Sequence, residues 1–436
     1  MKDGDPSVCP LGAGGGGGEG LMSDIEKEGF FVSRRPLVAG ERRLIGWELC
    51  FGSQDGRTLS AGEKDSAEYL TAVREFAETT DWDALLCGGR ALLVVDRRLV
   101  FSDVIDAFPR NRMLLGLRPC EEIDANLSNR LHHLHSRRGA RLLFLGYARR
   151  DPREQLLALA DAVEIDAFNL EERARSLLVR RAQRRNLQIL AMSVERDADF
   201  VRIRESGYEL FSGGSYCEHS PDGETGANAN GKELVRLLVD TRVDLELEAV
   251  SRRIKANPAL AEGLLRLVNS LEVARAATIE SVDQALIMIG TKGLSRWLNL
   301  LLFQMGSRPG IGGPLFRVAA SRAALMERLA GSRQDDSDAE QKTRGEAAFL
   351  VGILSLVHVL LGVDRSEAIS GLSLSDEMRG ALAFYDGEFG RMLALAESLD
   401  AGEFPAASEL AQELSISPKQ IWEYQRDAFE WVMRML

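Results

Sequence analysis

The sequence predicts an α/β half followed by an all-α half. At 436 residues the chain is too long for one hydrophobic core, so two domains are expected. From about Phe30 to His219, short apolar runs alternate with amphipathic segments, which is typical of parallel strands covered by helices. From Lys232 to Leu436, apolar residues recur every three or four positions, which indicates a helical bundle.

Seven short apolar segments are the expected strands of the first half. They lie at residues 44–51, 91–95, 113–117, 141–145, 162–165, 187–192 and 210–211, and helices are expected between them at residues 66–79, 123–137, 152–160 and 170–185. Repeated βα units of this size predict a (β/α) barrel. Because the region has fewer residues than the roughly 250 typical of the full fold, the pattern leaves open whether the barrel is complete or incomplete.

Two segments rich in glycine and polar residues mark the expected domain boundaries. Residues 1–28 include five consecutive glycines at 14–18 and are predicted to be a disordered tail, in which either Met1 or Met22 is the native start. This tail has no basic and apolar regions of a signal peptide. Residues 220–231, SPDGETGANANG, are the predicted linker. The expected domains are therefore residues 29–219 and residues 232–436.

Composition limits the classes of function. The formal net charge of −12 argues against broad electrostatic binding to nucleic acid or to anionic membranes. The longest apolar run, at residues 347–363, is at the lower edge of membrane-spanning length and contains a histidine, so a buried bundle helix is expected. The five cysteines show no zinc-ligand spacing, which favours reduced thiols and a cytoplasmic location.

Residues 31–51, FVSRRPLVAGERRLIGWELCF, resemble the opening of an EAL-type cyclic-di-GMP phosphodiesterase domain. Glu48 holds the place of the glutamate that begins the Glu-Ala-Leu motif. Gly52 stands where the family has an arginine that grips a phosphate of the dinucleotide. Because a glycine cannot replace a guanidinium that donates two hydrogen bonds to phosphate, the resemblance implies a degenerate EAL-like barrel.

The other positions of the family's metal and substrate site are also largely replaced. Two-metal hydrolysis of a phosphodiester needs several carboxylates that converge on the ions. Aligned by their local neighbours, three acidic remnants are left, at Glu48, Asp166 and Glu195. The lost positions are Gly52, Val94, Gly116, Gly146, Tyr147, Glu164, Met192 and Ser212. The resemblance therefore implies no catalytic residues, no bound metal and no cofactor.

The helical half has a resemblance of its own. NPAL at residues 257–260, LLRLVNS at 264–270, TIESVDQA at 278–285 and the Ile289-Gly290 pair are similar to the signature of HDOD domains. The signature positions are implied to be structural: Asn257, Pro258, Asn269, Ser270, Ile279, Ser281 and Gly290. Pro258 suits the first turn of a helix, and Gly290 can end a helix in a left-handed conformation.

The histidines give no firm metal site. His358 is the one histidine of the helical half, and without a partner histidine or aspartate it is expected to be a satisfied core or interface residue. His132, His133 and His135 form a cluster on a predicted helix. A solvated helix face is expected there, with chance zinc or nickel binding as the alternative.

An EAL-like barrel followed by an HDOD domain resembles a two-domain family of bacterial signalling proteins. The combination implies a non-catalytic cytoplasmic signal-transduction adaptor that acts through protein–protein interactions, linked to cyclic-di-GMP or two-component regulation. The implied partners are a sensor kinase, a diguanylate cyclase or another regulator, and a second copy of the chain as a homodimer. Cyclic-di-GMP, nucleic acid and membranes are not expected to bind. The alternative is a cyclic-di-GMP-binding receptor or a residual cyclic-di-GMP phosphodiesterase.

Overall fold

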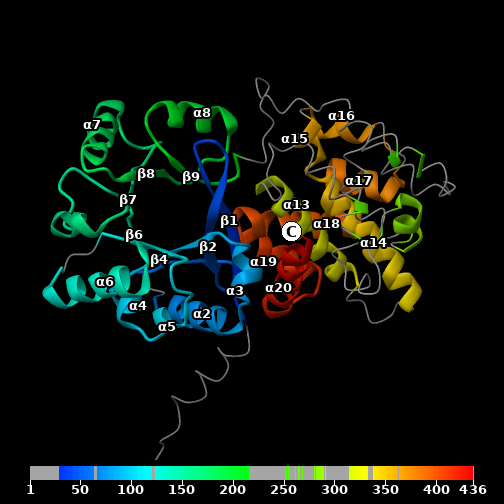
Figure 1. The fold of residues 1–436 in the computed structure, drawn as a ribbon. Helices are drawn as coiled ribbons and strands as arrows, with labels where there is room; N and C mark the ends of the chain where they lie inside the picture. Colours follow the sequence, from blue (N-terminus) through cyan, green and yellow to red (C-terminus); the bar gives the residue numbers. More distant parts are fainter. Residues whose placement is uncertain are drawn as a thin grey trace, which may run out of the picture.

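The computed structural model describes two halves that pack side by side (Figure 1). It covers residues 29–62, 66–119, 123–215, scattered positions between 251 and 290, and residues 314–331, 337–361, 363–370, 372 and 374–435. The predicted tail at 1–28 and the predicted linker at 220–231 lie outside the described residues. Among the helices of these ranges, none combines the length and the apolar character needed to span a membrane.

The first half is a closed barrel of eight strands. They are β1 (Phe31–Ala39), β2 (Leu44–Gly52), β4 (Arg90–Val95), β5 (Met113–Leu117), β6 (Arg141–Phe144), β7 (Ala162–Glu164), β8 (Gln188–Ala191) and β9 (Leu210–Ser212). Neighbouring strands from β2 to β9 are parallel, and β1 closes the sheet by pairing antiparallel with both β2 and β9. A two-residue strand, β3 (Thr58–Leu59), extends the sheet beside the end of β2. The barrel is therefore complete, which decides between the alternatives that the sequence left open.

Strand β1 is absent from the strands predicted from sequence. Its apolar run is interrupted by Arg34, Arg35 and Pro36, and proline cannot donate a hydrogen bond to a neighbouring strand. The structure accommodates Pro36 because β9 pairs only with residues 37–39 of β1. The two arginines are accommodated because each finds a buried partner on its own face of the strand.

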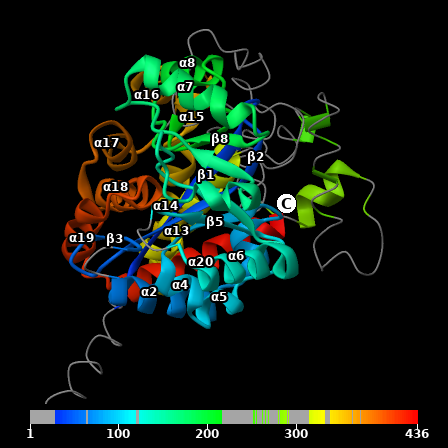
Figure 2. The same ribbon diagram turned by 90° about the vertical axis from the view of Figure 1, so that its left-hand side faces the viewer.

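Helices cover most of the outside of the barrel. They are α2 (Ser66–Thr79), α3 (Trp82–Leu86), α4 (Arg97–Phe101), α5 (Val104–Ala107), α6 (Ala125–Arg138), α7 (Glu172–Gln183) and α8 (Asp197–Glu205). Seen from the barrel side, α7 and α8 lie at one edge and α2, α4, α5 and α6 at the other (Figure 2). The three α-helices predicted at 66–79, 123–137 and 170–185 agree with α2, α6 and α7 to within two residues at each end.

The helix predicted at residues 152–160 is instead a short 3₁₀ helix, η1 (Glu154–Leu159). The chain before η1 is fixed by the buried ion pair between Arg153 and Asp151, and Arg153 also donates to the carbonyl oxygen of Leu145 at 2.7 Å. Only a few residues then remain before β7 begins, which favours the tighter helix in short pieces. Short helices α3 and α4 were not predicted, although Asp81 and Asp96 cap their first turns.

The described part of the second half is helical, as the sequence predicts. Its helices are α13 (Pro314–Ala330), α14 (Asp338–Leu354), α15 (Val357–Leu361), α16 (Arg365–Ser370), α17 (Asp376–Phe384), α18 (Gly387–Ala401), α19 (Phe404–Glu413) and α20 (Pro418–Met435). Ser337 and Glu340 form a capping box at the start of α14. Most of the remaining residues of this half, including the greater part of the HDOD signature, lie outside the described ranges.

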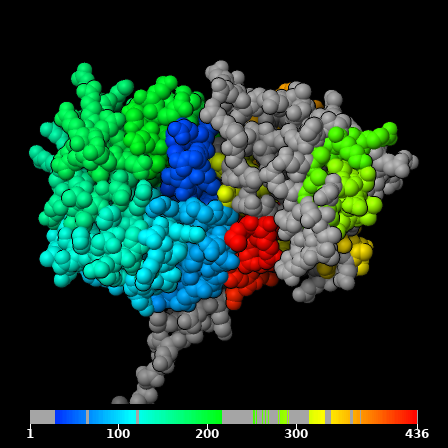
Figure 3. Space-filling view, in the orientation of Figure 1, coloured from blue at the N-terminus to red at the C-terminus, as the bar shows by residue number. Residues whose placement is uncertain are grey.

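The two halves share one outer core, whereas the barrel interior has a separate core. The inner core consists of Leu37, Leu92, Leu114, Leu143, Leu145, Ala162, Leu190 and Leu210. On the outside of β1, helices α13, α18 and α20 of the second half pack against the strand or against the helices beside it. The surface of α20 (red) abuts the first segments of the barrel (blue) in Figure 3. The helical half therefore takes the place of an outer barrel helix at β1.

Candidate functional site at the barrel mouth

The carboxyl ends of the parallel strands form the mouth of the barrel, where enzymes of this architecture place their catalytic groups. Glu48 lies on β2 directly opposite Arg35 of β1 and is 3% exposed. Arg35 Nη1 lies 3.9 Å from Glu48 Oε2, and Arg35 Nη2 forms an ion pair with Glu195 Oε1. The Ser212 hydroxyl donates a hydrogen bond to Glu48. One guanidinium thus neutralises two of the three carboxylates that the sequence identifies as remnants.

Cys50 follows Glu48 on the same face of β2 and points toward the same interior. Burial, and then the neighbouring Glu48 carboxylate, raise the pKa of the Cys50 thiol well above its usual value. Since the thiolate is the nucleophilic form, this cysteine stays protonated and unreactive near neutral pH.

The third remnant, Asp166, is used to shape the loop after β7. Its Oδ1 accepts hydrogen bonds from the backbone N–H groups of Phe168 and Asn169, each at 2.9 Å, and its Oδ2 accepts one from the Asn169 side chain at 2.9 Å. Burial raises the pKa of Asp166, but these hydrogen bonds outweigh burial, and the pKa falls below its usual value. The carboxylate is therefore ionised, with both oxygens engaged in a local turn.

Glu164, at a position where the family has a lysine, is an interior acid with no cation bound to its carboxylate tip among the described contacts. Its Oε2 accepts a hydrogen bond from the Gly146 N–H at 2.5 Å. Burial raises the pKa of Glu164, and the negative charges of Asp166 and Glu48 add to this effect. A phosphate placed beside Glu164 would therefore meet a carboxyl group at the position where EAL domains have a positively charged lysine.

Four of the lost positions are held in hydrophobic packing, three at the barrel interior and Tyr147 in the outer core. Val94 and Met192 pack against the inner core of the barrel. A Cβ on Gly116 would lie 3.0 Å from Leu145 Cδ1, so the leucine fills the space of a longer side chain there. Tyr147 is buried, and its hydroxyl has no hydrogen-bond partner in the described part of the chain. These positions supply packing rather than ligands.

Gly146 and Gly52, two more of the lost positions, are places that suit glycine for local reasons. Gly146 has a φ of +61°, the left-handed region that favours glycine. Gly52 ends β2 and faces Phe404 of α19. Neither backbone position offers an oxygen-bearing side chain.

The residues of the mouth do not fit a pair of divalent cations. Such a pair needs several convergent carboxylate oxygens on ions about 3.5–4 Å apart. Here the carboxylates of Glu48 and Glu195 share Arg35, and Asp166 is held in its own turn. Over the described ranges, no group of three or more His, Cys, Asp or Glu side chains is arranged to hold a metal.

Two arginines of this region escaped prediction from the sequence. Arg35 has a usable signal, since a charged residue that shares a strand face with Leu37 must point into the barrel. Arg153 has no local signal. It is completely buried and donates to Leu145 O at 2.7 Å and to the carbonyl oxygen of Leu117. It thereby joins the ends of β5 and β6 and stiffens the mouth.

The histidine predictions have mixed outcomes. His135 Nδ1 lies 3.1 Å from Ala140 O, which turns this ring away from a shared site with the exposed His132 and His133. His358 lies on α15, and its Nδ1 is buried with no hydrogen-bond partner in the described chain, so the expectation of a satisfied histidine is wrong for that atom. Burial, and then the nearby Arg365, lower the pKa of His358 to about 4.

The HDOD signature is described at three of its seven positions. Ile279 is buried, Ser281 is half-buried, and Gly290 has a φ of +68°, the left-handed conformation that glycine favours. Asn257, Pro258, Asn269 and Ser270 lie outside the described residues.

Comparisons with known proteins agree with this two-part organisation. The family model of the HDOD domain matches residues 232–357. The chain is 23% identical over 414 residues to the uncharacterized protein YuxH of Bacillus subtilis, an alignment that covers 93% of this chain and 98% of the relative. It is also 23% identical over 412 residues to the cyclic di-GMP phosphodiesterase CdgJ of Vibrio cholerae, with 92% of each chain covered.

A solved EAL domain protein of Listeria monocytogenes aligns with 47% of this chain and 94% of its own, at 15% identity and a TM-score of 0.36. The closed barrel at the N-terminus, the EAL-like residues of its first strands and the HDOD match are the features that identify the architecture. This chain therefore joins an N-terminal barrel that resembles EAL domains to a C-terminal region that contains an HDOD domain.

Proposed function

We propose that this chain is a non-catalytic signal-transduction adaptor, which acts through protein–protein contacts rather than by hydrolysing a dinucleotide. The observation that carries the proposal is the guanidinium of Arg35 between Glu48 and Glu195. A fixed cation of the protein itself occupies the place in which an enzyme of this architecture would use metal ions against the same acids.

The chemistry of phosphodiester hydrolysis supports the proposal. The attacking water must be activated, and the negative charge that develops on the phosphate must be stabilised. Val94, Gly116 and Met192 offer no ligand for an ion that could do this, and Glu164 adds negative charge beside the substrate position. The barrel keeps its packed core while the groups that the reaction needs are replaced.

Cyclic-di-GMP signalling is the setting that the relatives favour. The Vibrio cholerae relative that covers 92% of this chain is named as a cyclic di-GMP phosphodiesterase. An adaptor derived from such a protein would bind a sensor kinase, a diguanylate cyclase or another regulator of the same pathway, and it would do so in the cytoplasm. A homodimer is part of this proposal, and light scattering of the purified chain measures it directly.

A second candidate function is a receptor for cyclic-di-GMP, or a residual phosphodiesterase. The name of the Vibrio cholerae relative favours it, as does the survival of Glu48, Asp166 and Glu195. Against it stand the loss of the phosphate-gripping arginine at Gly52 and the engagement of all three acids within the protein.

The deciding experiment incubates the purified full chain with cyclic-di-GMP and either Mg²⁺ or Mn²⁺, with chromatography of the products. The Vibrio cholerae relative under identical conditions is the positive control. We expect no linear dinucleotide from this chain. Turnover that disappears in Glu48→Ala would contradict the adaptor proposal. Calorimetry with the dinucleotide then separates the receptor from the adaptor, because micromolar binding lost in Glu48→Ala supports the receptor.

The adaptor itself is tested by reconstitution. The full chain serves as bait in cells of the native organism, and each captured regulator is then purified and titrated against it. A direct complex whose formation changes the activity of a kinase or diguanylate cyclase supports the proposal. A chain that alters none of the captured regulators in purified form would contradict it.

A further inference from the structure

The end of the β1–β2 hairpin that lies at the barrel mouth is covered by the junction between α18 and α19. This junction, residues 400–408, is called the α18–α19 corner below. It bonds to β1 and to the turn that follows β2: Ser33 Oγ donates to Asp400 O at 3.4 Å, and Ser408 Oγ donates to Gln54 O at 2.9 Å. The corner therefore approaches from the face of β1 that also carries Arg35.

Gly52 is the place of closest approach. A Cβ on Gly52 would lie 2.7 Å from Cδ1 and 2.8 Å from Cβ of Phe404, and closer still to Cγ. These atoms belong to the rigid base of the ring, so they cannot move away without moving α19. Phe404 is completely buried and stacks on Phe31, the residue paired with Gly52, with ring centroids 6.5 Å apart. No side chain other than hydrogen fits at position 52 while Phe404 keeps this place.

Two further glycines let the backbones approach at the same junction. Gly56 has a φ of +82°, and a Cβ there would lie 2.8 Å from both Phe404 O and Pro405 Cα. Gly402 caps α18 with a φ of +79°, and a Cβ there would meet Ser33 and Arg35 at ordinary distances of 3.5–3.9 Å, so its left-handed backbone is what favours glycine. At Gly56 the hairpin region thus approaches the backbone of the corner too closely for any side chain, and at Gly402 the turn into the corner needs a left-handed residue.

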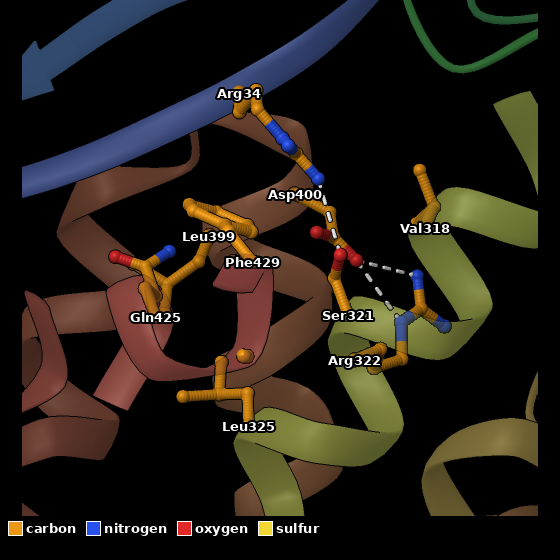
Figure 4. Close-up of a pocket in the computed structure, with 10 residues that line it drawn as sticks. Arg34, Val318, Ser321, Arg322, Leu325, Leu399, Asp400, Gln425 and Phe429 are labelled. Atoms are coloured by element: carbon orange, nitrogen blue, oxygen red, sulfur yellow. Dashed lines mark hydrogen bonds and ion pairs between the residues drawn. The ribbon is translucent and has the colours of Figure 1, made fainter. Parts of the chain in front are cut away.

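The outer face of the same hairpin is held by the second half as well. Arg34, which neighbours Arg35 but points outward, donates to Ser321 Oγ of α13 at 3.1 Å. Its guanidinium lies over the ring of Phe429 of α20 at 3.9 Å. Figure 4 shows Arg34 extending from β1 toward Ser321, beside Phe429 and Asp400. Helices of the second half therefore contact both faces of the hairpin.

We propose that the mouth end of the β1–β2 hairpin is a docking site for the α18–α19 corner of the same chain, with Phe404 seated where an arginine at position 52 would project. Loss of the phosphate-gripping arginine and docking of the helical half are then one structural change. The inference extends the proposed function. It rests on that function in one respect, because it treats position 52 as part of a barrel mouth that does not hydrolyse the dinucleotide.

The test uses the full chain and compares three variants with a matched control. Gly52→Ala adds one methyl group against Phe404, Phe404→Ala removes the ring, and the double variant combines the two. Gly40→Ala is the control, since Gly40 lies at the other end of the same hairpin and its Cβ would meet Arg204 Cδ at an ordinary 3.7 Å. Thermal unfolding and hydrogen exchange of the hairpin and the α18–α19 corner are measured without nucleotide.

We expect Gly52→Ala and Phe404→Ala each to lower Tm by about 5 °C or more and to speed exchange in both segments, while Gly40→Ala changes neither. In the double variant we expect the fall in Tm to be clearly smaller than the sum of the two single losses, because the ring atoms Cγ and Cδ1 that the methyl group would meet are gone and only the contact with Cβ of residue 404 remains. Additive losses, or a Gly52→Ala protein that matches the Gly40→Ala control, would overturn the inference. If Gly52→Ala gives no folded protein, exchange in Phe404→Ala decides, since an unchanged hairpin contradicts docking.

Because no nucleotide is present in these measurements, their outcome is separate from the test of the proposed function. A chain that hydrolyses cyclic-di-GMP while its hairpin and corner unfold together would refute the adaptor and keep the docking site. A chain without activity in which the losses of Gly52→Ala and Phe404→Ala are additive would support the adaptor and refute the docking site.

Discussion

Arg34 and Arg35 are neighbours on β1, yet they serve two different regions of the molecule. Successive side chains of a strand point to opposite faces, so the Arg34 side chain points away from the barrel and the Arg35 side chain points into it. Arg34 donates to Leu85 O at 2.5 Å and lies between the rings of Trp47 and Phe429, at 3.8 and 3.9 Å from their centroids. Arg35 instead meets the carboxylates of Glu48 and Glu195.

The two arginines lie in different environments: Arg34 at the interface between the halves and Arg35 among the acids of the barrel mouth. At the outer face, the buried guanidinium of Arg34 contacts oxygen atoms and two aromatic rings drawn from both halves, and it lies close enough to Asp400 for their charges to interact. At the mouth, Arg35 is held by the carboxylates of Glu48 and Glu195 and neutralises them. One strand thus connects the interface between the halves to the barrel mouth.

The largest effect is expected from Arg34→Ala, which removes both aromatic contacts and the buried hydrogen bonds. We expect the free energy of unfolding to fall by about 4 kcal/mol, because charged hydrogen bonds and cation–π contacts are lost together. Urea denaturation measures this loss. The exposed Arg43 on the same hairpin gives the control, and Arg43→Ala should change stability by less than about 0.5 kcal/mol. Equal losses of stability in the two variants would show that the buried contacts of Arg34 do not hold the halves together.

Acid should weaken the helical half through His358. The folded pKa of about 4 lies below the usual value of 6.5, so the unfolded chain takes up the proton first. The contribution of His358 to stability is present above pH 6.5 and is lost as the pH falls toward 4, by up to about 3 kcal/mol. Arg365 and Arg322 disfavour the protonated ring, and Glu397 favours it.

Denaturation at several pH values should therefore show a shallower acid loss in His358→Gln than in the wild type. The matched control is His132→Gln, which replaces an exposed histidine and should leave the pH profile of the wild type unchanged. Identical profiles for the wild type and His358→Gln would show that His358 is solvated.

Arg35→Met should cost about 2 kcal/mol at neutral pH, because it leaves Glu48 buried without a cation. Arg35→Lys keeps the charge and should recover part of this loss. Adding Glu48→Gln to Arg35→Met should also recover part of it, since the uncompensated acid is removed. If Arg35→Met unfolds at the same denaturant concentration as the wild type, the ion pair between Arg35 and Glu48 does not contribute to stability.

Glu164→Gln should have the smallest effect and the opposite sign. Burial raises the folded pKa of Glu164, so the folded state binds its proton more tightly than the unfolded state. The wild type therefore loses stability as the pH rises above about 4.3, the usual pKa of a glutamate. At pH 7 the amide should gain up to about 1 kcal/mol, and near pH 4 the two proteins should unfold alike. A glutamine variant that is less stable at pH 7 would contradict the view that Glu164 is a half-buried acid without an ion-pair partner in the described part of the chain.

The sequence predicted the parallel strands because their apolar runs are local patterns, and it assigned Glu48, Asp166 and Glu195 by motif position. It missed β1 because two arginines and a proline interrupt its apolar run, and because one of its two neighbouring strands, β9, is distant in the chain. The contact between Gly52 and Phe404 could not be predicted for the same reason. Only the tertiary fold brings α19 to the barrel mouth, and the residues around position 52 contain no pattern that predicts this contact.

The central claim is that the barrel mouth cannot hold two divalent cations, and Mn²⁺ titration of the full chain followed by electron paramagnetic resonance tests it most directly. The account predicts no saturable Mn²⁺ site that depends on Glu48. Two spin-coupled Mn²⁺ ions, lost together in Glu48→Ala, would contradict it.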